Sequence, residues 1–121
     1  MSIFTLVAVP PRIEKFSFRE GLGEGMRTRV ICGVYQGAEP LSLEWLQDGR
    51  PLETAVLAGV TVKPIDRFSS VLMIGPLRAD HSGRYTCRAQ NAAATAESTA
   101  DLVVNGEVLA RIYVGIARVL T

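Results

Sequence analysis

Several kinds of residue are scarce in this chain, and their scarcity excludes whole classes of function. The 121 residues include one histidine, one tryptophan and two cysteines, and aromatic residues make up 7%. Thirteen Lys and Arg residues balance twelve Asp and Glu residues, without a run of like charge. Binding a nucleic acid requires clustered cations, often with aromatic side chains between them, so a nucleic acid is not an expected partner. With a single histidine and no calcium-loop motif, we expect no metal and no cofactor.

Long apolar runs are also missing. The longest, residues 108–120, is interrupted by Arg111 and Arg118 and is too short to span a bilayer. Residues 1–9 are apolar, but they lack a basic leader and are too short for a complete secretory signal. We therefore expect membrane association only through the remainder of a longer parent protein.

The two cysteines, Cys32 and Cys87, are separated by fifty-five positions and flank the only tryptophan, Trp45. This spacing is not the C-x-x-C of a zinc or redox site, so a single structural disulfide in an oxidising compartment is favoured. A pair of buried free thiols is the alternative. Either way, both cysteines are expected in the core.

Alternation of apolar and polar residues predicts short strands throughout the middle of the chain. Turn residues separate them, as in residues 36–40 and 48–51, where Gly and Pro provide turn geometry. The parity of Cys32 and Cys87 then decides which side chains point inward. The expected strands cover residues 27–32, 43–45, 60–63, 69–74, 84–89 and 99–104.

The segment from Asp80 to Cys87, with Tyr85 two residues before the cysteine, resembles the D-x-G-x-Y-x-C signature of immunoglobulin domains of the V and I sets. The short region after Trp45 favours the I set. The resemblance implies an all-β, immunoglobulin-like (I-set) two-sheet Greek-key sandwich with one inter-sheet disulfide, Cys32 to Cys87. It also implies a core containing Trp45, Leu72 and Tyr85, a Tyr85 hydroxyl that ties down a corner, and a salt bridge between Arg67 and Asp80.

Three further segments, residues 10–18, 43–52 and 68–72, are similar to domains of arthropod Dscam, the Down syndrome cell adhesion molecule. The similarity extends to the alternatively encoded variable domains of that family, including the shortened chelicerate forms. It implies an extracellular, cell-surface module for homophilic, isoform-specific binding in neuronal self-recognition, with a protein partner that is a second copy in trans.

The resemblance covers residues 10–105 and leaves an extension at each end. Residues 1–9 and 106–121 match nothing in the family, so both are interpreted either as translated flanking sequence or, for the second, as a real strand or amphipathic helix. These alternatives stay open.

Enzyme activity is not expected. Asp80, His81 and Ser82 are the residue types of a hydrolase triad, but consecutive residues do not adopt its geometry. We expect His81 to be a solvated turn residue. The glycine-rich residues 21–25 lack the Lys and Ser or Thr of a phosphate-binding loop.

The two outer faces of the sandwich are expected to differ. Outward residues of the strands at 43–45, 84–89 and 99–104 are polar and charged, which is typical of a solvated face. On the other sheet an apolar centre lies beside basic residues, which resembles an interface core with a polar rim. The interface candidates are Arg27, Arg29, Ile31, Thr61, Lys63, Val71 and Met73.

Scattered surface apolar residues are the plain alternative for this face. In a self-interface, the basic candidates should lie off the symmetry axis and meet acids such as Glu14, Glu20 or Glu24 of the other molecule. Two other functions remain open. One is a structural I-set spacer of a muscle or cytoskeletal protein, and the other is an immune-type receptor that binds ligand through the loops at 36–40 and 91–95.

Overall fold

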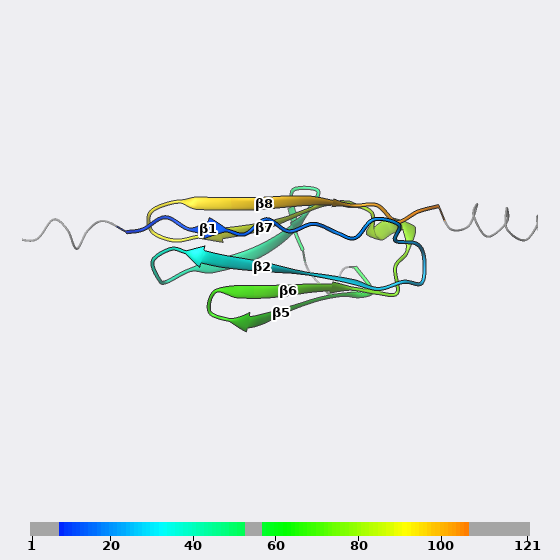
Figure 1. Ribbon diagram of the computed structural model, residues 1–121, viewed down its shortest axis with the longest axis horizontal. Coiled ribbons are helices and arrows are strands. Elements are labelled where there is room, and N and C mark those ends of the chain that lie inside the picture. The colour runs from blue at the N-terminus through cyan, green and yellow to red at the C-terminus, as the bar shows by residue number, and fades with distance from the viewer. Residues whose placement is uncertain (1–7, 53–56, 107–121) are drawn as a thin grey trace, which may run out of the picture.

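The computed structural model describes residues 8–52 and 57–106, and it shows two antiparallel sheets packed as layers (Figure 1). One sheet has the order β1-β2-β6-β5 and the other the order β4-β3-β7-β8. The fold is therefore the predicted all-β immunoglobulin-like sandwich. The strands are β1 (Arg12–Ile13), β2 (Thr28–Gln36), β3 (Ser42–Gln47), β4 (Arg50–Pro51), β5 (Val60–Asp66), β6 (Ser69–Ile74), β7 (Gly83–Gln90) and β8 (Thr95–Leu102), and a 3₁₀ turn, η2, spans Ala79–His81.

The inward and outward positions follow the predicted parity. On β2, Val30 and Cys32 are buried, whereas Arg29 and Ile31 are exposed. The same alternation buries Leu72 and Ile74 on β6. A one-residue slip would reverse every side chain, so the buried cysteine fixes the whole register of its strand.

The predicted bounds of two strands were wrong. β5 continues to Asp66, and β8 begins at Thr95 and ends at Leu102 rather than spanning residues 99–104. The reason for the early start of β8 lies in the preceding turn, where the Asn91 Oδ1 atom accepts hydrogen bonds from the backbone N–H groups of Ala93 and Ala94. This tight reversal lets β8 pair with β7 over its full length.

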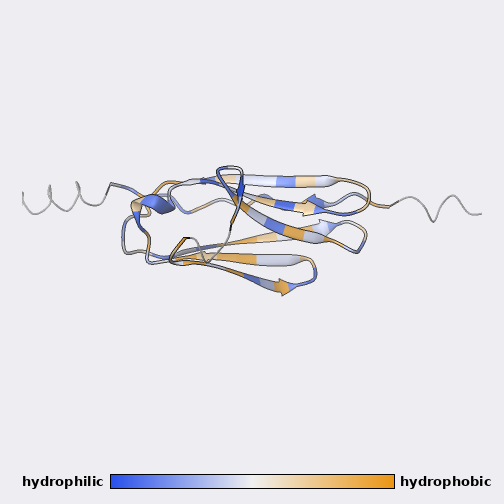
Figure 2. Ribbon diagram, turned by 180° about the vertical axis from the view of Figure 1, so that it is seen from behind, coloured by the Kyte–Doolittle hydropathy of each residue, from blue (hydrophilic) through white to orange (hydrophobic). Residues whose placement is uncertain are grey.

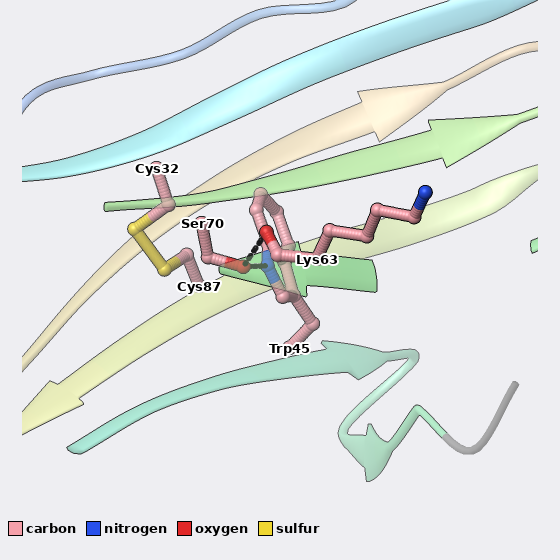
Figure 3. The surroundings of a disulfide bond; sticks show 5 residues. All are labelled: Cys32, Trp45, Lys63, Ser70 and Cys87. Atoms are coloured by element: carbon pink, nitrogen blue, oxygen red, sulfur yellow. Dashed lines mark hydrogen bonds between the residues drawn. A yellow bond between two sulfur atoms is a disulfide. The ribbon is translucent and has the colours of Figure 1, made fainter. Parts of the chain in front are cut away.

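A disulfide joins Cys32 of β2 to Cys87 of β7 and so connects the two sheets, as predicted. Trp45 lies in the same buried cluster (Figure 3). Its indole Nε1–H donates a hydrogen bond to Ser70 Oγ at 3.0 Å, and Ser70 Oγ donates to the Lys63 carbonyl at 3.3 Å. The only polar atom of the tryptophan is thus satisfied inside the core.

Two phenylalanines close the side of the core between β1 and β2. Phe16 packs edge-on against Trp45, with ring centroids 5.3 Å apart, and Phe18 packs against Tyr85 at 5.4 Å. The predicted extensions, residues 1–9 and 106–121, fall almost entirely outside the described residues. Their interpretation stays a prediction.

Candidate interaction surface

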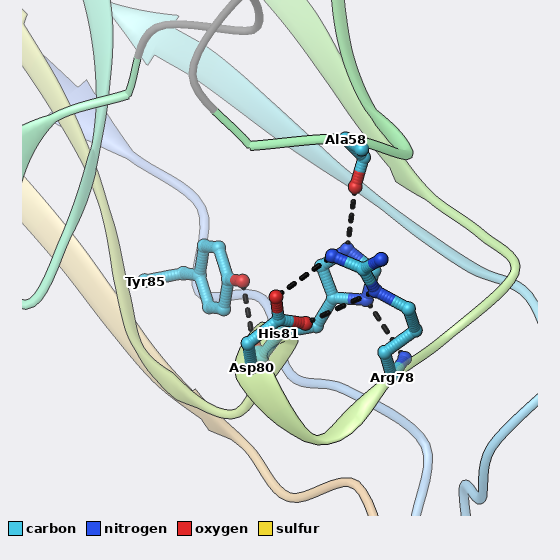
Figure 4. Close-up of polar contacts among 5 residues, drawn as sticks. All are labelled: Ala58, Arg78, Asp80, His81 and Tyr85. Atoms are coloured by element: carbon cyan, nitrogen blue, oxygen red, sulfur yellow. Dashed lines mark hydrogen bonds and ion pairs between the residues drawn. The ribbon is translucent and has the colours of Figure 1, made fainter.

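Tyr85 anchors the turn between β6 and β7. Its side chain is fully buried, and its hydroxyl donates a hydrogen bond to the His81 carbonyl at 2.6 Å (Figure 4). Burial of the phenol, with smaller contributions from the negative charges of Asp48 and Asp80, raises the Tyr85 pKa well above its ordinary value. The predicted tyrosine corner is confirmed.

His81 is not a solvated turn residue, and that prediction was wrong. Its side chain is 0% exposed. Nδ1 accepts a hydrogen bond from the Arg78 backbone N–H at 2.9 Å, so the proton resides on Nε2, which donates to the Ala58 carbonyl at 2.8 Å (Figure 4). Both ring nitrogens are occupied by backbone groups. The imidazole therefore links the segment before β5 to η2.

The neighbours of His81 do not form a catalytic arrangement. Asp80 pairs with Arg78, and Ser82 Oγ accepts a hydrogen bond from the Val104 backbone N–H at 2.9 Å. In the part of the chain that the structure describes, no three His, Cys, Asp or Glu side chains gather as metal ligands. Within the same ranges, no helix is long and apolar enough to cross a bilayer.

The predicted salt bridge between Arg67 and Asp80 does not form. Arg67 instead pairs with Glu39 at 3.3 Å, and Asp80 pairs with Arg78 at 2.8 Å. Arg67 lies in the turn before β6, whereas Asp80 lies in η2 beyond the other end of that strand. A six-residue strand is roughly 20 Å long, which puts the two side chains out of reach. Both observed pairs are exposed and contribute little to stability.

The outer face of the β4-β3-β7-β8 sheet neutralises its own charges. Arg88 forms ion pairs with Glu97 at 2.8 Å and with Glu44 at 3.3 Å, and Arg84 pairs with Asp101 at 3.1 Å. The hydrogen bond to Glu97 raises the Arg88 pKa above its ordinary value. Such a face needs no charged partner.

Leu46 is an exception on this polar face that the sequence analysis missed. It has outward parity, because Trp45 beside it points inward, yet it is only 2% exposed. Its position at the pairing site with Pro51 of β4 is consistent with this burial.

The outer face of the other sheet brings all seven interface candidates together, and we call it the β2–β6 face. Strand pairing places them in rows. Arg29, Met73 and Thr61 are direct neighbours across β2, β6 and β5, and Ile31, Val71 and Lys63 form the next row. The Arg27 side chain lies beside Gly75 at the end of β6. Ile31 is 53% exposed, whereas Val71 and Met73 are half-buried. Hydrophobic residues run along β6 in Figure 2.

Additional residues extend this face beyond the predicted set. Tyr35 shares the outward parity of Ile31 and is 61% exposed. Asp66 lies at the same end, where hydrogen bonds from Ser69 Oγ and the Phe68 N–H hold its pKa below the ordinary value. Parity alone could have identified Tyr35.

A groove of about 690 Å³ lies at the opposite end of the β2–β6 face. Arg19, Arg27 and Arg29 line it together with Met26 and Met73. Within residues 8–52 and 57–106, none of these three arginines forms an ion pair. Their charges are available to a partner.

The loops at residues 36–40 and 91–95, the alternative binding site, meet at one end of the sandwich. The Asn91 Nδ2 atom donates to the Val9 carbonyl at 2.7 Å and to the Ala38 carbonyl at 3.1 Å. One side chain thus holds the start of the described chain and both loops together.

Comparison with known proteins agrees with this architecture. The family model for the immunoglobulin domain matches residues 10–91. The chain belongs to the immunoglobulin domain family. Within this immunoglobulin family it is similar to the cell adhesion molecule Dscam2 of Drosophila melanogaster, with 55% identity over 98 residues, and to human DSCAM, with 40% identity over 103 residues. These matches cover 81% and 85% of the chain, which spans 5% of the length of each relative.

A solved immunoglobulin domain gives the same result. The crystal structure of the Dscam1 Ig7 domain, isoform 5, superposes with a TM-score of 0.76 at 33% identity. The match covers 82% of this chain and 100% of that domain. The resemblance to Dscam is confirmed.

Proposed function

We propose that this immunoglobulin domain is an extracellular recognition module that binds a second copy of itself through the β2–β6 face. One observation supports this most strongly. The face presents an apolar centre, Ile31 with Val71 and Met73, surrounded by charged and polar residues. An apolar patch with a polar rim is typical of a protein interface. The opposite face, by contrast, pairs its charges internally.

The relatives point to the same class of function, because Dscam2 and DSCAM are named cell adhesion molecules. The Cys32–Cys87 disulfide agrees with an oxidising, extracellular location and is not required of an intracellular spacer domain. The proposed role is homophilic, isoform-specific binding between cell surfaces, as in neuronal self-recognition, with the chain held at the membrane by the remainder of a parent protein.

A cell aggregation assay tests the proposal. The chain is displayed on otherwise non-adhesive cells, and clusters are scored in mixtures with cells that display sister variants. Like cells should cluster with like and exclude the others. Met73→Asp and Ile31→Asp should abolish clustering, because each puts an unpaired charge into the apolar centre.

Ser42→Asp is the matched control, since Ser42 is exposed on the outer face of the other sheet. It should leave clustering unchanged. If the Ile31 and Met73 variants fold and still cluster like the wild type, the β2–β6 face is not the interface.

The second candidate function, ligand binding by the joined loops, is favoured by the Asn91 contacts alone. Charge substitutions in the exposed residues 92–94 distinguish it. They should leave self-association intact if the β2–β6 face is the interface, and they should reduce binding if the loops are.

A further inference from the structure

The charges of the β2–β6 face are separated along the strands. The outward positions along β2 and its approach are, in order, Arg27, Arg29, Ile31, Gly33 and Tyr35. Arginines thus occupy one side of Ile31, which we call the basic end. The other side carries Gly33, which has no side chain, and Tyr35.

Glu14 fills the space that Gly33 leaves. Its backbone N–H donates to the Gly33 carbonyl at 2.9 Å, and a Cβ atom on Gly33 would lie 3.7 Å from Glu14 Oε2. The Glu14 carboxylate is therefore next to the outward position of Gly33. With Asp66 it forms the acidic end of the face. Arg29 and Gly33 are each two residues from Ile31, or about 7 Å along the strand in opposite directions.

The charges at both ends lack partners of their own. Among the described residues, neither Arg29 nor Glu14 forms an ion pair. Arg67, which also lies at the acidic end, is neutralised by Glu39. Arg12 lies opposite Gln36, further from Ile31 than Glu14 is. Arg29 and Glu14 are thus free to interact with another molecule.

Symmetry restricts how two such faces can meet. When two copies of one face pack against each other, the two-fold axis lies in the interface. An axis parallel to the strands would place basic end on basic end, and like charges across an interface are unfavourable. An axis across the strands, through the row of Ile31 and Val71, reverses the strand direction and places basic end on acidic end.

We propose that two copies pair with antiparallel β2 strands, so that Arg29 of each copy meets Glu14 of the other and this reciprocal pair contributes to specificity. The inference rests on the proposed function and specifies its register. The same operation brings Tyr35 of one copy to Arg27 of the second copy, at the arginine-lined groove. Lys63 lies on the axis row, at the edge strand β5, and meets only its own copy at the solvated rim.

Reciprocal charge reversal tests the register. Arg29→Glu gives a copy with two acids at these positions, and Glu14→Arg gives a copy with two bases. Each variant should bind itself about tenfold or more weakly, because symmetry applies every substitution twice. The two variants mixed together should associate about as well as the wild type. The double variant should bind itself and reject the wild type.

Sedimentation of the purified chains and two-colour cell aggregation report these outcomes. Lys63→Glu is the matched control, with the same charge change on the same face, and self-association should change by less than about threefold. Wild type that does not self-associate refutes the proposed function and this register with it. Wild type that self-associates while Arg29→Glu and Glu14→Arg behave normally, or fail to associate when mixed, overturns the register alone. Loss in Lys63→Glu equal to that in Arg29→Glu also overturns it. Recovery in the mixture excludes misfolding of either variant.

Discussion

Replacing His81 should destabilise the domain strongly, although the residue sits in a surface turn. His81→Leu keeps an apolar side chain of similar bulk but removes the acceptor of the Arg78 N–H and the donor to the Ala58 carbonyl. A buried backbone group left without a partner costs about 1 to 3 kcal/mol. Water can reach exposed Ala58, so the Arg78 N–H accounts for most of the loss, and we expect about 2 kcal/mol in total. In a domain of this size that lowers Tm by roughly 10 °C.

Urea and thermal unfolding followed by circular dichroism measure this change. His81→Asn should lose less, because its side-chain oxygen takes approximately the place of Nδ1 and still accepts from the Arg78 N–H. Asp80→Asn is the neighbouring control, and it removes only an exposed ion pair that contributes less than about 1 kcal/mol. A solvated His81 would tolerate substitution within about 0.5 kcal/mol. A loss that small in His81→Leu would refute the hydrogen-bonded role.

Three other changes test the scaffold. Reducing the Cys32–Cys87 disulfide should lower the free energy of unfolding by about 4 kcal/mol, because it releases a long loop in the unfolded chain; equal urea midpoints with and without reductant would contradict this. Stability should fall above pH 10, because the raised Tyr85 pKa keeps the phenol protonated in the folded state after it ionises in the unfolded state. The loss should reach about 1 kcal/mol per pH unit after allowance for solvent screening, and a flat profile between pH 10 and 12 in alkaline unfolding experiments would exclude it. Asn91→Ala should cost about 1 to 2 kcal/mol and speed amide exchange at Ala93 and Ala94, whose N–H groups lose their acceptor; unchanged exchange there would argue against the role of Asn91.

Local patterns in the sequence were sufficient for the layers and the parity of the strands. Side chains alternate with a period of two, so Cys32 and Cys87 identify every inward and outward neighbour on their own strands. This is why Ile31, Val71 and Met73 were correctly assigned to one outer face. The disulfide and the Tyr85 corner followed from the resemblance to immunoglobulin domains.

Contacts between distant segments required the tertiary structure. Burial of His81 depends on Ala58, which no local pattern connects to the turn at residue 81, and the partners of Arg67 and Asp80 depend on which end of β6 each occupies. The position of Glu14 depends on β1 packing beside a glycine of β2. The sequence by itself determined which side of each strand faces water, because that is a property of consecutive residues. Only the tertiary structure decided which of those exposed charges are already paired and which remain for a partner, because pairing depends on distances between segments far apart in the chain.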